Sequence, residues 1–506
     1  MVKAVVGEES QLQLAEDRLS RSSEPAQVGL VIGKLNSALD RGFVFDLVPT
    51  PQNDAGQPAC LVLEPAKDNK KKGSKSKSQT SDSSSNLVID KDWVAEHARQ
   101  VSRMMVGGIK VVGIYVWASE AAFKNSTMVL CQTVKGVAEA ASTLEDDLDE
   151  RLLIHICYSP RRWTCRNCTL SSNITSSSLR PCDFKMGRVL TSLQTFKCLY
   201  NFDLSIKSMS LVIFEQQRYM LLRLPIYQEK TSKSETLVDV LCNGISNYVK
   251  ELRGAKAVID GNLVVNDEAC TTEGLHEVEL LLPFMKDMYI EACSQKDVVG
   301  VVNFTGSLCS FSFLNSKEPI SQAVADIKDD IIRSLRSRLD IICDEADEDP
   351  GPIDNGIKEA GNDLASEKPV SQLVLHSLRK NCNLSLPRRV FVPWLAGTYI
   401  CDYLQPSEIL EVLKDHCVEL MSMEAPNDAS KILEPEEEAI RVSTRSFRDV
   451  VLPYCSTSSS THEKNIEITG KENSQKTSKS PSLYFIAAVI LLLLSVLVGL
   501  VFVRKS

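Results

Sequence analysis

Four cysteines between residues 157 and 182 are the side chains whose type and spacing come closest to a metal site in this sequence. Cys165 and Cys168 form a C-x-x-C pair, a spacing that begins many zinc sites because both thiolates can then reach one ion. A structural zinc site needs a second close pair, and here only the single residues Cys157 and Cys182 flank the first one. We expect these thiols to be mainly buried or loop residues, and the sequence leaves open whether Cys165, Cys168 and Cys182 bind metal.

The histidines and glycines add no catalytic motif. The six histidines are spread along the chain and form no H-E-x-x-H element, and Gly300 and Gly306 lack the spacing and the following lysine of a phosphate-binding loop. A cysteine nucleophile would need a histidine close to it in space, which the sequence by itself leaves open. The sequence therefore predicts no catalytic residue, no metal ligand and no cofactor, and we do not expect an enzyme.

The elements that would position any site begin with a first module, residues 1–224, in which strand and helix patterns mix. A lysine- and serine-rich stretch at 66–86 has little to bury and predicts a disordered insert. Apolar runs bounded by glycine or proline predict strands, and recurrence every three to four residues predicts helices. The predicted strands are 28–33, 43–48, 59–63, 109–116, 152–157 and 198–202. One predicted helix follows Asp90 or Asp92, either of which can cap it, and another spans 127–141.

A second module is predicted over residues 225–343. It should contain a hairpin that turns at Asp260-Gly261 and an amphipathic helix over 319–343 whose charged residues cover the face opposite its apolar stripe. An acidic linker, 344–371, should follow, and strand and helix elements within 372–454 are expected to pack on the second module. Together the two modules predict an α+β or mixed α/β fold.

The last apolar segment predicts a membrane anchor. From Leu483 to Val503 the chain carries 21 uncharged residues, enough for a helix of roughly 31 Å that matches the hydrocarbon core of a bilayer. Residues 455–482, rich in serine, lysine and asparagine, predict a flexible tether. Because only three residues follow the segment, insertion should follow translation and leave the body on the cytosolic side. We expect a single-pass, tail-anchored protein whose partners include the lipid bilayer.

Composition limits the partners further. The formal net charge of −9 and the pI near 5.4 give no basic footprint for nucleic acid, so we expect no nucleic-acid partner. The 16 cysteines of a cytosolic body would lie in a reducing compartment and serve mostly as small buried hydrophobic residues.

The strand-like run 112–119, Val-Gly-Ile-Tyr-Val-Trp-Ala-Ser, resembles part of the MPN (Mpr1/Pad1 N-terminal) fold. Active members of that family hold zinc with two histidines and an aspartate, and these positions fall on Val116, Ala118 and Val129 here. Valine and alanine offer no donor for zinc. The resemblance therefore implies an inactive MPN-like domain, of the kind that serves as a scaffold or dimer partner.

Several segments together resemble the Odr-4 (odorant response abnormal 4) family, in a plant-like version. They are residues 29–33, 161–165, 323–338 and 386–393, with the terminal anchor. The resemblance implies a protein at the endoplasmic reticulum membrane that is linked to receptor folding and trafficking. It also implies a partner, the cysteine protease that removes the ubiquitin-fold modifier from its targets.

The function expected from both lines is that of a non-catalytic adaptor, which recruits or stabilises that protease at the endoplasmic reticulum membrane. A chaperone for folding or trafficking of membrane receptors is the alternative, and an unrecognised hydrolase is a third possibility. The basic residues Arg504 and Lys505 would also suit the mitochondrial outer membrane, so the choice of membrane rests on the resemblance.

Overall fold

The structure is a computed structural model, and it describes residues 2–36, 40–63, 85–142, 150–170, 178–202, 223–227, 237–264, 274–282, 298–316, 318–348, 383–424, 426, 428–436 and 439–446. These residues belong to a compact unit, Met1–Val451. The predicted insert 66–86 lies outside them except for its last two residues, and the predicted tether and anchor, 455–503, lie wholly outside. Within the described residues, no helix is both long and apolar enough to cross a bilayer.

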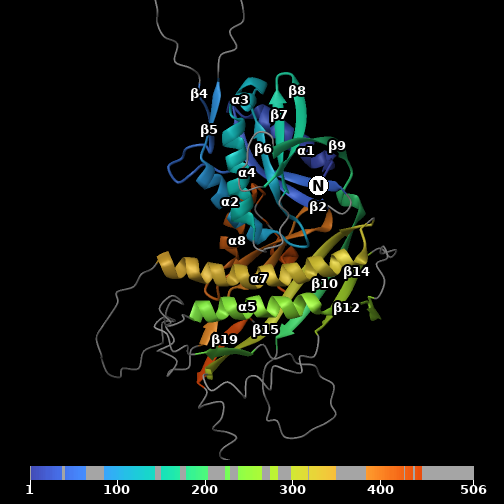
Figure 1. Cartoon of the computed structure of the whole chain (residues 1–506), viewed down its shortest axis with the longest axis vertical. Coiled ribbons are helices and arrows are strands. Elements are labelled where there is room, and N and C mark those ends of the chain that lie inside the picture. The colour runs from blue at the N-terminus through green and yellow to red at the C-terminus, as the bar shows by residue number, and fades with distance from the viewer. Residues whose placement is uncertain are drawn as a thin grey trace, which may run out of the picture. The chain divides into compact units, whose positions relative to one another are not determined.

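Seven strands from the first part of the chain form a closed barrel (Figure 1). The chain closes it by placing β1 parallel to both of its neighbours, β3 and β9. Long apolar runs suit the central strands β2, β6 and β7, which are buried on both faces along most of their length. In barrel order the strands are β1 (Ala4–Glu8), β3 (Arg41–Pro49), β2 (Gln27–Asn36), β6 (Lys110–Trp117), β7 (Glu150–Tyr158), β8 (Arg161–Thr169) and β9 (Leu179–Gly187).

Helices cover the two faces of the barrel strands. The apolar stripe of α1 (Glu9–Arg21) packs on one face, and α2 (Lys91–Met104) and α4 (Thr127–Ala141) pack on the other. The short α3 (Glu120–Asn125) joins β6 to α4. Of the two predicted caps, Asp90 is the one used, because its side chain accepts a hydrogen bond of 3.1 Å from the Trp93 amide. A two-stranded ribbon, β4 (Cys60–Leu63) and β5 (Asn86–Ile89), lies beside α3 and α4.

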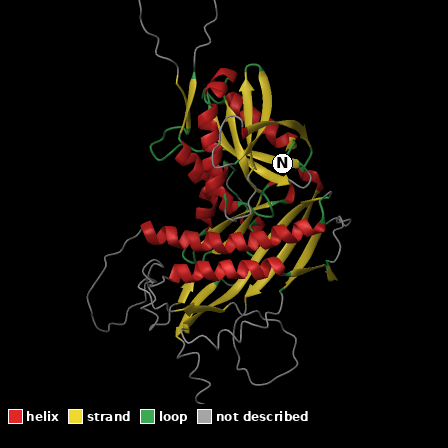
Figure 2. Ribbon diagram, viewed as in Figure 1, coloured by secondary structure: helices red, strands yellow, loops and turns green. Residues whose placement is uncertain are grey.

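The second module is an eight-stranded sheet, and the helices α5 (Leu237–Gly254) and α7 (Ile320–Glu348) run side by side across it (Figures 1 and 2). The predicted hairpin is confirmed: Asp260 and Gly261 have φ of 48° and 80°, as a tight two-residue turn requires. The strands are β13 (Asn262–Leu263), β12 (Lys256–Ile259), β14 (Leu275–Leu281), β10 (Leu193–Phe202), β15 (Val298–Asn315), β19 (Arg441–Ser446), β16 (Asn383–Ser385) and β11 (Arg223–Tyr227). The mixed α/β class predicted from the sequence is thereby confirmed.

The boundary predicted at residue 224 needs correction, because the barrel ends with β9. The next strand, β10, pairs along its whole length with β15, from Leu193 opposite Asn315 to Phe202 opposite Gly306. An apolar strand pattern shows that a strand forms, but it does not show which sheet that strand joins. The helix α7 also runs on to Glu348, into the first residues of the predicted acidic linker.

The C-terminal elements are divided between the two modules, which corrects the expectation that residues 372–454 pack on the second module. The strands β16 and β19 do extend the second sheet. However, β17 (Arg388–Pro393), β18 (Tyr399–Leu404) and α8 (Leu410–Met421) bury their apolar side chains in the same core as α2 and α4 of the barrel. The same core also contains Phe311 of β15, whose ring packs against Phe391 of β17 and Tyr399 of β18, so these elements lie between the barrel helices and the second sheet.

The charged face of α7 is not a solvent face. Asp326 accepts a hydrogen bond of 2.6 Å from Lys34 of β2, and Asp330 is bonded by both terminal nitrogens of Arg389 in β17 at 2.8 and 2.9 Å. All four side chains are at most 8% exposed. A third buried pair joins Arg338 to Glu436. Since charges leave water only when they are paired, α7 is the element that connects the barrel, the second sheet and the C-terminal segment.

A partly exposed histidine on α8 predicts a pH dependence. Nδ1 of His416 lies 2.8 Å from Oδ2 of Asp402, and this hydrogen bond raises the pKa of His416 above its usual range although partial burial opposes the shift. Because the folded state binds the His416 proton more tightly than the unfolded state, the pair with Asp402 stabilises the folded chain. This stabilisation is complete below pH about 6.5 and is lost as the pH rises through the raised pKa of His416.

The measurement is the urea midpoint of the wild type and of His416→Gln across this pH range. The difference between the two midpoints is expected to shrink as the pH rises. A difference that grows with pH would contradict the assigned pairing.

Candidate functional site

The three positions that the resemblance to the MPN fold aligned with zinc ligands are apolar, and two of them lie at the end of the barrel strand β6. Val116 is the penultimate residue of the strand, Ala118 follows its end, and both have no exposed surface. Val129 lies on α4 and is half-buried against the same core. These side chains fill the core, and none of the three carries a metal donor.

A cluster of polar side chains lies next to these positions. Glu120, His155 and Cys157 each place one potential ligand atom within 4.8 Å of the other two, and they are the one such trio found in the described part of the chain. His155 and Cys157 are two residues apart on β7 and therefore point to the same face of the sheet. Glu120 is the first residue of α3, which the Ser119 side chain caps by accepting a hydrogen bond from the Ala122 amide.

The ring of His155 is held in one orientation. Its Nε2 lies 3.1 Å from the carbonyl oxygen of Ala118, so Nε2 carries the proton and donates it, while Nδ1 is the unprotonated nitrogen. The ring also stacks on Phe123, with 4.0 Å between the centroids and 12° between the planes. Burial lowers the pKa of His155 below its usual range in spite of the bond to Ala118, so the imidazole is neutral at pH 7.

Glu120 is ionised and faces two cations at the rim of the cluster. Partial burial acts to raise its pKa, but the hydrogen bond and charge of Lys124 and the charge of Arg162 bring the pKa below its ordinary value. Arg162 donates to Oε2 at 2.9 Å, and Lys124 lies 3.2 Å from Oε1. The carboxylate is 32% exposed, so the cluster is reached from its Glu120 side.

Of the predicted candidates, the structure brings Cys165 and Cys182 together and separates Cys168 from both. Cys165 and Cys168 are three residues apart on β8 and therefore face opposite sides of the sheet. Cys165 pairs with Cys182 across β8 and β9, whereas Cys168 faces Cys131 of α4. The neighbouring thiol and burial raise the pKa of Cys165 and of Cys168, so both stay protonated at neutral pH. The C-x-x-C spacing that looks like a zinc pair is thus a consequence of two separate packing contacts.

The other cysteines also follow the prediction of small buried residues. Of the 12 cysteines in the described segments, nine are buried and none forms a disulfide.

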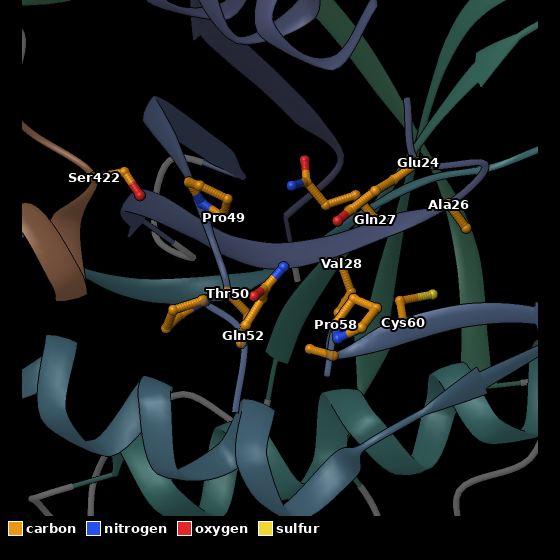
Figure 3. Close-up of a pocket in the computed structure, with 12 residues that line it drawn as sticks. Glu24, Ala26, Gln27, Val28, Pro49, Thr50, Gln52, Pro58, Cys60 and Ser422 are labelled. Carbon is orange, nitrogen blue, oxygen red and sulfur yellow. The ribbon is translucent and has the colours of Figure 1, made fainter. Parts of the chain in front are cut away.

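A pocket of about 220 Å³ opens beside β2, the strand that pairs with β6. Val28 of β2 lines it and pairs in register with Val116 of β6. Figure 3 shows Val28 close to Pro58 and Cys60, while Ser422 reaches the far edge from the segment after α8. Burial and the charge of Glu24 raise the pKa of Cys60 to about 12, so this thiol is not a nucleophile at neutral pH.

The pocket and the polar cluster differ in what they can do chemically. The pocket walls combine proline and valine with the amides of Gln27 and Gln52, two hydroxyl side chains and the carboxylate of Glu24, which suit a small polar ligand or a short peptide segment. The Glu120–His155–Cys157 cluster is the part of the described chain with metal-ligand chemistry, and the reasoning from sequence missed it. The sequence did contain one signal for this cluster: His155 and Cys157 are two residues apart on a predicted strand, so their side chains share a face. Nothing in the sequence indicated that Glu120 would join them.

Comparisons with known proteins agree with one another over most of the chain. The family model described as "ODR4-like: Odorant response abnormal 4-like" matches residues 29–432. A Mus musculus protein named "Protein odr-4 homolog" is 24% identical over 419 residues, which are 78% of this chain and 78% of that protein. The Homo sapiens protein of the same name is 25% identical, over 66% of this chain and 69% of its own length. The Dictyostelium discoideum protein of that name is 23% identical, over 82% and 78%.

One solved structure, described as "Crystal structure of UfSP from C.elegans", is similar with a TM-score of 0.35 and 7% identity. The alignment covers 84% of this chain and 57% of that one. A likeness this small supports no conclusion about the fold.

Proposed function

Because the chain belongs to the odorant response abnormal 4-like family, we propose that it is a non-catalytic adaptor, anchored in a membrane, whose body holds a cytosolic protein partner. In this proposal the barrel is an inactive MPN-like domain that serves as a binding scaffold. The chain itself performs no reaction.

The observation that carries the proposal is the chemistry of the three positions where an active MPN domain needs its zinc ligands. Val116 and Ala118 have no exposed surface and Val129 is half-buried in the same core, so a metal at these positions would meet hydrocarbon. A hydrolase of this class cannot work without an ion there, because the ion activates the attacking water. A scaffold needs only the shape of the domain, and the apolar residues stabilise that shape.

The 21 uncharged residues 483–503 support the membrane part of the proposal. An anchor of this kind raises the concentration of a bound partner at the membrane without any new contact between them. We place the anchor in the endoplasmic reticulum membrane, with the body in the cytosol, and insertion in the mitochondrial outer membrane is the other outcome that localisation would distinguish.

The partner we propose is the cysteine protease that removes the ubiquitin-fold modifier, in keeping with the family resemblance carried by residues 29–33, 161–165, 323–338 and 386–393. The Cys60 thiol in the pocket stays protonated at neutral pH and is not a nucleophile. This agrees with a partner protease that brings its own catalytic cysteine. Membrane receptors are the alternative partners.

The test is affinity capture of the tagged full chain from detergent-solubilised cells, with mass spectrometry of bound proteins and an assay for cleavage of the modifier. We expect the protease to bind in near-equal amounts and to account for all cleavage. The matched control is the chain without residues 483–503, which should still bind the protease but leave it in the soluble fraction.

Other outcomes would overturn the proposal in distinct ways. Cleavage by the full chain in the absence of bound protease would make the chain an enzyme. Capture of membrane receptors without the protease would favour the chaperone role.

A further inference from the structure

We propose that Glu120, His155 and Cys157 form a site for a divalent transition metal of the zinc class, which clamps α3 to β7. The proposal does not depend on the adaptor function. It concerns residues other than Val116, Ala118 and Val129, which cannot bind metal.

The backbone brings the three ligands together without strain on any of them. The strands β6 and β7 are parallel neighbours, and Val116 is in register with His155. The chain therefore leaves β6 directly above His155, turns at Ala118 and starts α3 with Glu120. Cys157 lies two residues further along β7 on the same face as His155. The site thus rests on regular elements of the barrel, which is where precise ligand geometry is best maintained.

The orientation of His155 is the one that a metal ligand requires. Its Nε2 donates to a backbone carbonyl oxygen, as the second nitrogen of metal-bound histidines commonly does, so Nδ1 presents its lone pair to the cluster. Nδ1 lies 3.9 Å from Oε2 of Glu120, which is too long for a hydrogen bond. Two ligand atoms of tetrahedral zinc lie about 3.3 Å apart, so a small inward movement of the carboxylate would be enough.

The donor set selects the class of metal. One imidazole nitrogen, one thiol and one carboxylate are typical zinc ligands, whereas magnesium and calcium prefer oxygen alone. The Cys157 thiol is 3.4 Å from the carbonyl oxygen of Ser159 and would lose its proton to the solvent on binding. Three protein ligands leave the fourth tetrahedral position to water.

Arg162 competes with the ion for Glu120. Its guanidinium donates to Oε2 at 2.9 Å, and its side chain is 57% exposed, so it is able to swing into solvent when a metal binds. A positive charge at this distance must lower the affinity for a cation. Removing that charge is therefore expected to strengthen binding, an effect opposite to that of removing a ligand.

The experiment uses the full chain, purified in detergent and freed of metal, titrated with Zn²⁺ by calorimetry and with Co²⁺ by absorption. We expect one ion per chain and a sulfur-to-cobalt charge-transfer band. His155→Ala and Cys157→Ala should each weaken metal binding at least about tenfold. Even removing a residue that only hydrogen-bonds to a metal ligand typically costs about tenfold in affinity, and these two residues are ligands themselves. Arg162→Ala should bind several-fold more tightly. The matched control, Cys168→Ala, removes a buried thiol of the same barrel outside the cluster and should bind as the wild type does.

Folding of each variant is checked by circular dichroism before metal is added. If His155→Ala or Cys157→Ala does not fold, Glu120→Gln replaces it, because Glu120 is partly exposed and the amide keeps its shape. The proposal is overturned if the wild type takes up no stoichiometric ion. It is equally overturned if Cys157→Ala binds as well as the wild type, or if Arg162→Ala binds more weakly.

Discussion

Replacing Arg389 with alanine is expected to destabilise the folded chain by about 3–5 kcal/mol, the cost of leaving one buried charge without its partner. Arg389 has no exposed side-chain surface, and its two terminal nitrogens donate to both oxygens of Asp330 at 2.8 and 2.9 Å. Its guanidinium also lies over the rings of Phe391 and Tyr403. Alanine would leave the Asp330 carboxylate, only 2% exposed, without this pairing.

The neighbouring residue supplies a matched control. Arg388 pairs with Glu434, but both side chains are more than one-third exposed, and such surface pairs contribute about 0–1 kcal/mol. Urea denaturation followed by tryptophan fluorescence should therefore separate Arg389→Ala clearly from Arg388→Ala. Equal losses for the two variants would show that the α7 pair is not desolvated. Replacing Asp330 and Arg389 together with leucine and methionine should cost less than Arg389→Ala, because no charge is then left unpaired.

A second large effect is expected for Gly113→Ala in β6. A Cβ atom at this position would lie 2.0 Å from the carbonyl oxygen of Leu152, which is the residue in register on β7. Backbone cannot move aside as a flexible side chain can, so the barrel would have to open between these two strands. We expect a loss of about 3 kcal/mol or more, at the upper end of the range for overpacked cores.

Gly136→Ala is the control for this prediction, because the same substitution should there be favourable. Gly136 lies within α4, and the nearest atom to an added Cβ is Cβ of Ala95 at 3.8 Å, an ordinary contact. Alanine is preferred over glycine in a helix by about 1 kcal/mol. Thermal unfolding should therefore move in opposite directions for the two variants. Similar midpoints for both would contradict the close approach of β6 and β7.

Helices and turns are the features that the sequence predicted well, for reasons that lie within a few residues. The predicted helix 319–343 is confirmed as α7, because its apolar residues recur every three to four positions. The helix starting after Asp90 is confirmed together with its cap, and so is the turn at Asp260-Gly261. Each depends on side-chain periodicity, on one capping side chain or on two residues with positive φ.

Which sheet or core each element joins was harder to predict than whether it is a helix or a strand. The pattern of β10 is the same whether it closes the barrel or joins the second sheet, and its ten-residue pairing with β15 decides the matter. In the same way, the charged stripe of α7 has the pattern of a solvent face. Lys34 and Arg389, from distant parts of the chain, turn that stripe into a buried interface.

In the candidate site, too, the residue types alone settle some points, and the tertiary structure settles the others. The residue types at Val116, Ala118 and Val129 already exclude zinc there, and no structure is needed for that conclusion. The C-x-x-C pair, by contrast, looked like a metal site until its cysteines were placed on opposite faces of β8. The cluster of Glu120, His155 and Cys157 needs β6 and β7 to be parallel neighbours, which no local pattern reveals.

By itself, the sequence determined the type of the elements with the strongest local patterns, such as α7, α2 and the turn at Asp260-Gly261, that Val116, Ala118 and Val129 carry no metal donor, and that 483–503 is long and apolar enough for a bilayer. Only the tertiary structure decided which strands share a sheet, where the charges of α7 are paired, and which metal-binding side chains meet. The physical reason is the separation along the chain over which each interaction acts. Backbone propensity and periodicity act over a few residues, whereas Lys34 and Asp326, 292 positions apart, become partners only when the whole chain has folded.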